Sequence, residues 1–167
     1  MASSKTFALA PRSGASQLVR VPADPAHAIS PGQLLSYDGA ACRPATATAV
    51  VGGALEDAQQ AFARTFLGVA HGRSPAGDGG PVSVDVSPTA VYAAAREPGE
   101  AVAFGAYLTP ADDGAALSSA RLAVAGGGGG AVGRAVEAKA AGDPGPVRVS
   151  FASAFCTAAA NVAGFLG

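Results

Sequence analysis

Two segments of the chain alternate apolar and polar residues in the manner of β-strands. Residues 81–86 read Pro-Val-Ser-Val-Asp-Val, and residues 146–151 read Pro-Val-Arg-Val-Ser-Phe. Because successive side chains of a strand point to opposite faces, the valines and Phe151 share one face of each strand. We expect that face to be buried and the other face to be open. The leading proline of each segment removes no ladder hydrogen bond at that position.

Both alternating segments belong to an internal repeat. Residues 66–86 (FLGVAHGRSPAGDGGPVSVDV) align without a gap with residues 131–151 (AVGRAVEAKAAGDPGPVRVSF), at an offset of 65. Nine of the 21 aligned positions are identical, among them the run Ala-Gly-Asp-x-Gly-Pro-Val-x-Val. Repeats of this period decide the architecture of a chain, so they come before any local assignment.

The repeat continues upstream with small gaps. Residues 32–41 contain Gly-Gln-Leu-Leu-Ser followed by Asp-Gly-Ala-Ala, and residues 105–116 contain Gly-Ala-Tyr-Leu-Thr followed by the same four residues. Each copy therefore predicts a strand, an Asp-Gly turn, further strands and an Ala-Gly-Asp turn. We expect one β domain over residues 18–151, built from a first module (residues 18–86) and a second module (residues 87–151).

Two kinds of turn are predicted within these modules. Asp-Gly between apolar residues is a hairpin signal, because a type I′ turn needs positive φ at both of its central positions. In the Ala-Gly-Asp segments the aspartate side chain is expected to cap its own turn. The predicted turn residues are Asp38, Gly39, Asp113, Gly114, Gly77, Asp78, Gly142 and Asp143.

One segment of the first module has helical rather than strand periodicity. Over residues 54–66, apolar side chains recur at the spacing of a helix face. They are Leu55, Ala58, Phe62 and Phe66. Acidic residues near the start and Arg64 near the end suit the helix dipole, so we expect a short helix covering one end of the β structure. The second module instead has five glycines at 126–130, which predict either a mobile loop or a close approach of backbone to a neighbour.

The composition fits a turn-rich β protein. Apolar residues make up 49% and charged residues 14% of the 167 residues, which excludes a disordered charged tail. Eleven basic and 12 acidic residues give a net charge of −1, so the chain lacks the basic footprint of a nucleic-acid partner. With 23 glycines, 12 prolines and no tryptophan, we expect a mainly β fold. It would be a small β-barrel or β-sandwich of two repeated modules, with one short helix and extended terminal arms.

The chain ends differ from the repeats. Residues 1–17 are expected to form an N-terminal arm, and they lack the continuous apolar core of a signal peptide. Residues 152–167 form an uncharged apolar tail that is rich in small residues, which disfavours a membrane span. Exposed apolar area marks contact sites, although both ends could instead pack on their own domain or fray. The residues expected at a capsid or subunit interface are Phe7, Leu9, Phe151, Phe155, Phe165 and Leu166.

Candidate catalytic or metal-binding groups are scarce. His27 and His71 lie in dissimilar contexts without ligand spacing, and we expect His71 to be a solvated turn residue. Cys42 and Cys156 form no Cys-x-x-Cys pair, and we favour buried reduced thiols over a disulfide. Ser74 lacks the spacing and the strand-to-helix context of a nucleophile elbow. We therefore expect no catalytic residue, metal or cofactor.

The order of these motifs resembles capsid decoration (cement, or head-stabilising) proteins of tailed bacteriophages. The resemblance rests on Pro-Gly-Gln-Leu-Leu-Ser at 31–36, Asp-Gly at 38–39, and a helix leading into Phe-Leu-Gly-Val-Ala at 66–70. In the second half it rests on Val-Gly-Arg-Ala-Val from residue 132, then Ala-Gly-Asp and the final Val-Arg-Val. It covers residues 18–151. The double copy and the long C-terminal extension depart from the single-barrel members.

The resemblance implies a structural role in the virion. Such a protein has a small β-barrel or β-tulip-like core, forms a homotrimer, and binds the outside of the capsid. There it stabilises the mature lattice of major capsid protein. It would be located on the capsid surface, after a period in the cytoplasm of the infected host. It would not be an enzyme and would have neither nucleic acid nor membrane as a partner.

Two other functions stay open. A non-enzymatic β-sandwich that binds a ligand or carbohydrate would use Tyr37, Tyr92 and Tyr107 as its aromatic platform. A hydrolase or isomerase assembled at a subunit interface would need His71 to converge with an aspartate. That convergence is not expected, because Val136 stands at the position of His71 in the second module.

Overall fold

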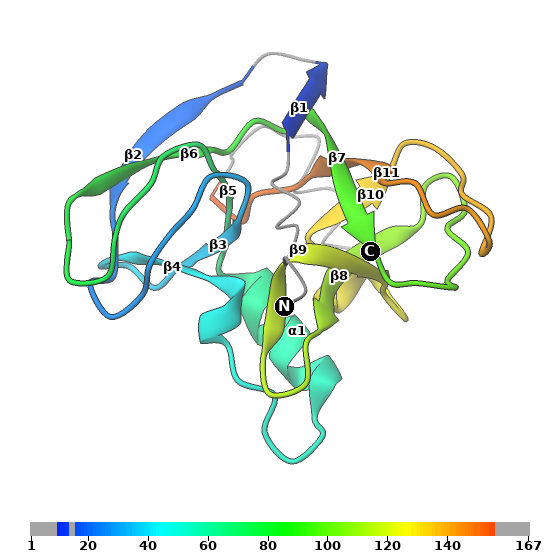
Figure 1. Cartoon of the computed structure of the whole chain (residues 1–167), viewed down its shortest axis with the longest axis horizontal. Helices are drawn as coiled ribbons and strands as arrows, with labels where there is room; N and C mark the ends of the chain where they lie inside the picture. The colour runs from blue at the N-terminus through cyan, green and yellow to red at the C-terminus, as the bar shows by residue number, and fades with distance from the viewer. Residues whose placement is uncertain (1–9, 14–15, 156–167) are drawn as a thin grey trace, which may run out of the picture.

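The computed structural model describes residues 10–13 and 16–155. The N-terminal half contains β1 (Ala10–Ser13), β2 (Leu18–Pro22), β3 (Leu34–Tyr37), β4 (Cys42–Pro44), the 3-10 turn η1 (Ala45–Ala47), α1 (Leu55–Arg64), β5 (Phe66–Ala70) and β6 (Pro81–Asp85). The C-terminal half contains β7 (Val91–Arg96), β8 (Tyr107–Asp112), β9 (Leu117–Val124), the 3-10 turn η2 (Gly128–Gly130), β10 (Gly133–Ala135) and β11 (Val147–Phe151). Figure 1 shows the two halves side by side, with α1 below them.

The two modules have the same strand order. The first forms a sheet with the order β2-β6-β5-β3-β4, and the second has the order β7-β11-β10-β8-β9. β6, β5, β3 and β4 correspond to β11, β10, β8 and β9 in the order of the repeat, and β7 takes the place of β2 at the edge. The prediction of a mainly β, barrel-containing fold from two repeated modules with one helix is therefore confirmed.

The modules differ in how far their sheets close. In the second, β7 and β9 pair in parallel through Ala95 with Arg121 and through Arg96 with Leu122, which closes a five-stranded barrel. In the first, a single parallel bridge joins Ala23, just after β2, to the start of β4. The two edges of the first sheet thus meet only just beyond the end of β2.

Part of the predicted N-terminal arm forms a strand. β1 runs antiparallel to β7, with Ala10 opposite Ala93 and Ser13 opposite Val91. This places residues 10–13 along the edge of the second module of their own chain. Figure 1 shows β1 beside β7 at the top of the molecule.

A glycine at the same position of each repeat lets two strands approach closely. A Cβ atom on Gly68 would lie 2.1 Å from the carbonyl oxygen of Asp85, and one on Gly133 would lie 2.6 Å from that of Ser150. Real Cβ atoms do not come that close to a backbone oxygen. The identity of this position in the two repeats therefore has a packing cause.

The Asp-Gly hairpins form, but not with the predicted turn type. β3 pairs with β4, and β8 with β9, across the two Asp-Gly segments. Only the glycines have positive φ, +100° at Gly39 and +92° at Gly114, and no other residue type does so in the described chain. The prediction of type I′ turns was therefore wrong. In the first turn, Asp38 keeps an ordinary φ because its carboxylate accepts the N–H groups of Ala40 and Ala41 at 2.9 and 3.0 Å.

The second hairpin uses a different aspartate as its cap. Asp112 Oδ1 accepts the N–H of Gly114 at 2.9 Å, while the predicted turn residue Asp113 lies 3.4 Å from the Arg121 guanidinium. The insertion of two residues before this turn explains the change, because it places an extra carboxylate, that of Asp112, on the strand side. The Asp113 N–H still bonds to Ala116 across the turn.

The Ala-Gly-Asp turns are capped as predicted. Asp78 Oδ1 accepts the N–H of Gly80 at 2.8 Å, and Asp143 Oδ1 accepts the N–H of Gly145 at 2.7 Å. For Asp143, these bonds and the neighbouring Lys139 hold the pKa of the carboxyl below its usual range. The two aspartates are turn caps in matching places.

The predicted helix is confirmed as α1, with one correction at its end. Phe62 is buried on the inner face of α1, and the Gln59 side chain donates to the Pro110 carbonyl of β8 at 2.9 Å. Phe66, which was expected to continue the helix, is the first residue of β5. Its burial in the same core as Phe62 produced helical spacing across a helix–strand boundary.

The glycine run packs against this helix. η2 lies beside α1, and a Cβ on Gly130 would lie 3.4 Å from the Cβ of Gln59. Of the two alternatives for this run, the structure bears out the close approach of backbone to a neighbour. Because α1 belongs to the first module and η2 to the second, this contact joins the modules.

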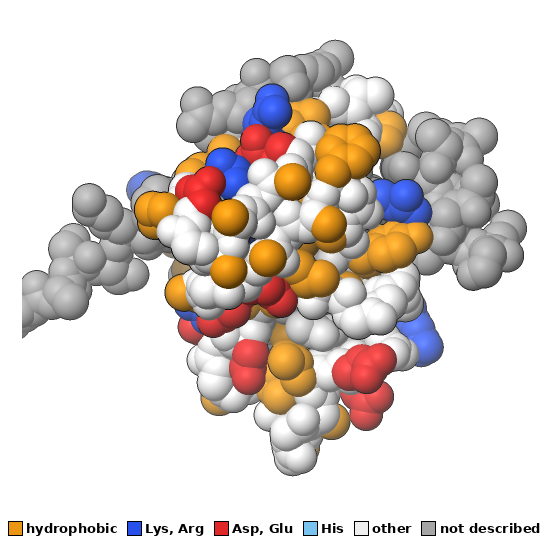
Figure 2. All heavy atoms as spheres, turned by 90° about the vertical axis from the view of Figure 1, so that its right-hand side faces the viewer, with side chains coloured by type: hydrophobic (Ala, Val, Ile, Leu, Met, Phe, Trp, Pro, Cys, Tyr) orange, Lys and Arg blue, Asp and Glu red, His pale blue; other side chains and the backbone are white. Residues whose placement is uncertain are grey.

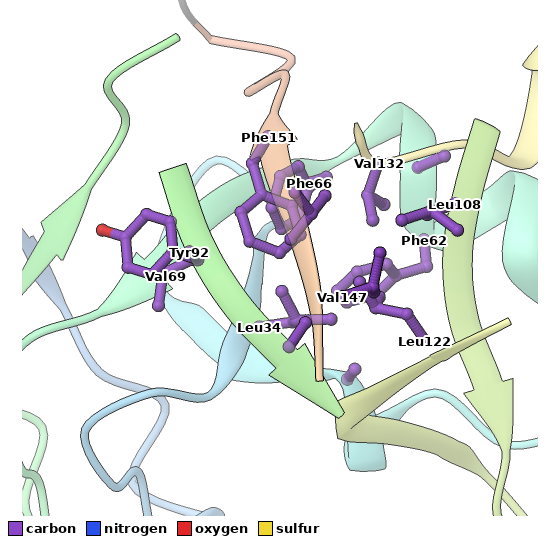
Figure 3. Close-up of a cluster of buried hydrophobic side chains, with 14 of the residues drawn as sticks. Leu34, Phe62, Phe66, Val69, Tyr92, Leu108, Leu122, Val132, Val147 and Phe151 are labelled. Carbon is purple, nitrogen blue, oxygen red and sulfur yellow. The ribbon is translucent and has the colours of Figure 1, made fainter. Parts of the chain in front are cut away.

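The core has two parts. One fills the interior of the first module and consists of Ala23, Ile29, Leu35, Cys42, Leu67, Ala70, Val82, Val84 and Val86. The other fills the second module and extends to the outer face of the first. Figure 3 shows Phe66 of β5, Phe151 of β11 and Tyr92 of β7 meeting there, with ring centroids 5.8 and 5.7 Å apart along the row. The predicted buried faces of both alternating strands are confirmed.

Candidate functional site

The predicted interface residues divide into three groups. Phe7, Leu9, Phe165 and Leu166 lie outside the described residues. Phe151 is 5% exposed in the core, so its assignment to an interface was wrong: it continues the buried face of β11 and is covered by the first module. Phe155 is 47% exposed, and its ring meets that of Tyr37 edge-on at 5.5 Å.

Several large apolar side chains of the described chain are exposed. They are Leu18 (53%), Val51 (76%), Phe104 (75%) and Phe155. Val51 lies in the loop before α1, and Phe104 lies in the loop between β7 and β8. Figure 2 shows hydrophobic side chains scattered among charged ones on the face it draws, rather than gathered into one patch. Val51 and Phe104 thus offer separate apolar contacts on loops, and Leu18 offers one at the start of β2.

A buried polar cluster lies where the two modules meet. Asp85 at the end of β6 accepts hydrogen bonds from the Tyr92 hydroxyl of β7 and from the N–H groups of Gln17 (3.0 Å) and Ser87 (2.9 Å). His71 Nε2 lies 3.0 Å from the Tyr92 hydroxyl and 3.8 Å from the Asp85 carboxylate. Since the Tyr92 proton goes to Asp85, His71 is the donor to the Tyr92 oxygen.

The environment fixes the protonation of the two buried groups. Burial would raise the pKa of Asp85, but the hydrogen bonds from Tyr92, Ser87 and Gln17 outweigh it and lower that pKa. Burial and the adjacent carboxylate raise the pKa of Tyr92. At neutral pH the cluster therefore holds an ionised Asp85 carboxylate and a protonated Tyr92 phenol. The hydrogen bond between them is charge-assisted.

This cluster corrects two expectations. His71 is a partly buried hydrogen-bond donor rather than a solvated turn residue, and it does converge with an aspartate. The space lined by Asp85, Tyr92, Phe66 and Phe151 has no room for a water-sized molecule. The carboxylate and the phenol bond to each other, the carboxylate also bonds to backbone N–H groups, and the phenol also bonds to His71, so the geometry serves to tie β5, β6 and β7 together.

The sequence pattern did not indicate that Asp85 is buried, and the reason is physical. In the alternation of β6 it occupies an outward position, which is typical of a solvated residue. It is 3% exposed because the second module covers that face. The repeat has Ser150 at this position. In the sequence, Asp85 differs from an ordinary solvated strand residue only in that its counterpart in the repeat is the serine Ser150.

A shallow cleft of about 360 Å³ opens on the second module. Its lining consists of three prolines, small residues, two acidic residues and the buried Arg96; the prolines are Pro98, Pro144 and Pro146, and the acidic residues are Glu97 and Asp143. Arg96 donates to the carbonyls of Glu100, Ala140 and Asp143, and so links the β7–β8 and β10–β11 loops. The two terminal nitrogens of the guanidinium thus hold the walls of the cleft, whereas its buried Nε has no hydrogen-bond partner.

The three tyrosines do not form a joint platform. Tyr92 is buried in the core, and Tyr107 is covered by the Arg134 guanidinium, 4.4 Å above its ring. Tyr37 contacts Phe155 instead. A carbohydrate platform of all three rings is therefore wrong, because one of them is a core residue.

Other candidate chemistry is limited in the described residues. Cys42 is a buried free thiol, and burial raises its pKa to about 11; Cys156 lies outside the described residues. Within residues 10–13 and 16–155 there is no group of three or more His, Cys, Asp or Glu side chains placed to hold a metal ion. None of the described helices has the length and hydropathy needed to cross a bilayer.

No family model, curated protein or solved structure matches this chain.

Proposed function

We propose that this chain is a structural virion protein that binds the outside of a phage capsid and stabilises the mature lattice of major capsid protein. The sequence resemblance described above motivates the proposal. The observation that carries it is the duplicated β body: two five-stranded modules of one strand order, fused through a shared core. Such a body is suited to bridging neighbouring subunits of a regular shell.

The exposed loops give this body its contacts. Phe104 and Val51 are exposed at 75% and 76%, and they lie on loops at the ends of strands and helix rather than on the sheet faces. Apolar side chains contribute roughly 25 cal/mol per Å² when buried, although the entropy of association cancels much of this for one contact. Single loop contacts are therefore weak, and several are needed at once.

Repetition provides the needed strength. We propose a homotrimer, so that three copies engage several capsid subunits together. Once the first copy is bound, the later contacts are effectively intramolecular, and modest interfaces combine into firm attachment. Binding that favours the expanded shell then stabilises that shell by mass action.

Co-sedimentation tests the proposal. The full chain is mixed with empty expanded capsids assembled from the major capsid protein encoded in the same genome, then pelleted. We expect saturable binding in a fixed ratio to capsid subunits, and weaker binding by a Val51→Ser, Phe104→Ser double variant. Ser83→Ala, on the sheet, is the matched control and should bind normally. Absence of the wild-type chain from the pellet would contradict the proposed function.

A further inference from the structure

We propose that the free edge of β2 binds an extended strand supplied by a partner protein. β2 and β7 occupy the same place in the strand orders of the two modules. The outer edge of β7 is covered, because β1 pairs with its first half and β9 with its last two residues. In the described chain, the outer edge of β2 is crossed only beyond its end, where Ala23 bridges to Cys42.

The backbone groups of Leu18 and Arg20 face this free edge. The carbonyl of Gln17 accepts the N–H of Val86, on the side of β6. Because backbone groups alternate between the two edges of an antiparallel strand, residues 19 and 21 also face β6, whereas Leu18 and Arg20 face away. Two N–H and two C=O groups are therefore presented in the register that an added strand requires.

Burial beneath the two edges differs in the same way. In β7, the inward side chains Tyr92 and Ala94 are fully buried. In β2, the inward side chains Val19 and Val21 pack against the core but remain partly exposed. A half-open apolar strip next to unpaired backbone groups is the arrangement used in recognition by strand addition.

The surroundings define the chemistry of the strand. Arg20 is exposed, and among the described residues it contacts the Pro81 carbonyl at 3.4 Å and forms no ion pair. A strand with small apolar residues against Val19 and Val21, and an acidic residue beside Arg20, is complementary to this edge. β1 of this chain already lies on β7 and does not cover the β2 edge, and the proposed occupant of that edge is a strand of another protein. The proposal holds for a partner of any function and does not rest on the capsid.

Amide hydrogen exchange on the full chain tests whether the edge is free and can be filled. The N–H groups of Leu18 and Arg20 should exchange fast, whereas that of Ala93, opposite β1, should be protected. The probe is a capped eight-residue peptide of alternating valine and glutamate. At saturation it should slow exchange at Leu18 and Arg20 at least about tenfold, because each amide gains a hydrogen bond. The matched valine–lysine peptide should bind about two- to fivefold more weakly.

Two variants of the same residue separate the backbone from the charge. Arg20→Pro removes the outward N–H, as Pro22 already does one step along the edge, and should abolish peptide binding. Arg20→Glu keeps the backbone groups and should reverse the preference toward the lysine peptide, so it remains informative if the proline variant does not fold. Protected Leu18 and Arg20 amides in the free chain would overturn the proposal. So would peptide binding that protects only Ala93, or equal binding of both peptides to wild type and to Arg20→Glu.

Discussion

At the scale of single residues, Gly68 and Gly133 show how backbone contacts constrain a sequence. Both stand where one strand passes against the carbonyl of the next, with no space for a methyl group. Neither position could be replaced without moving a strand of its own module. The repeat retains glycine there for packing, in contrast to the turn glycines, whose Cβ positions are open.

We predict that Gly68→Ala lowers the free energy of unfolding by about 1–3 kcal/mol, the usual cost of overpacking. The cause is the 2.1 Å separation of the new Cβ from the Asp85 carbonyl oxygen. Gly79→Ala is the control, because its Cβ would meet only ordinary contacts at 3.7 Å or beyond. Chemical denaturation measures both, and equal stability of the two variants would refute the close approach of β5 to β6.

A second residue-scale prediction concerns Tyr92 and Asp85. Tyr92→Phe removes a hydrogen bond to a buried carboxylate and should cost about 1.5–3 kcal/mol at pH 7. The folded pKa of Asp85 lies below its unfolded value near 3.9. The associated stabilisation is therefore complete above about pH 4 and is lost as the pH falls through the folded pKa.

The stability difference between wild type and Tyr92→Phe should accordingly shrink below about pH 4. Tyr107→Phe is the matched control, since its hydroxyl bonds to the Arg134 side chain at an exposed site. Denaturation at pH 7 and at pH 3 makes the comparison. A cost for Tyr92→Phe that does not change with pH would show that the Asp85 carboxylate is not its source.

At the scale of elements, the sequence predicts what is encoded locally. The alternation at 81–86 and 146–151, the capped Ala-Gly-Asp turns and α1 all follow from spacing and residue type within a few positions. The boundary of α1 does not, because Phe66 faces the same core from a strand. The cluster of His71, Asp85 and Tyr92 could not be predicted, since docking of the modules is what buries an outward-facing aspartate.

We predict that packing of its buried face, rather than the intrinsic helix propensity of its residues, stabilises α1. Phe62→Ala should reduce the free energy of unfolding by about 3–5 kcal/mol, because it leaves a cavity in the core shared by both modules. Phe104→Ala, on an exposed loop, should change it by less than about 0.5 kcal/mol. A small effect at Phe62 would mean that α1 does not seal this core.

At the scale of the whole molecule, the two modules are not independent. Leu34, Phe66 and Val69 of the first module share one core cluster with side chains of the second. The polar cluster and the contact of η2 with α1 add two further connections. A duplicated fold usually invites a description as two domains, but here the core of the second module continues into side chains of the first.

We therefore predict a single calorimetric unfolding transition for the full chain, with equal calorimetric and van't Hoff enthalpies. Tyr92→Phe should shift this transition to lower temperature without splitting it. Two resolved transitions, one for each module, would contradict a shared core.

Electron cryo-microscopy of capsids incubated with the full chain shows whether this chain binds the capsid lattice, and where. We predict added density on the outer surface at repeated lattice positions, into which both fused β modules fit. We also expect the Val51 loop or the Phe104 loop to face the shell. Capsids that acquire no such density at saturating protein concentration would contradict adhesion to the lattice as the role of this chain.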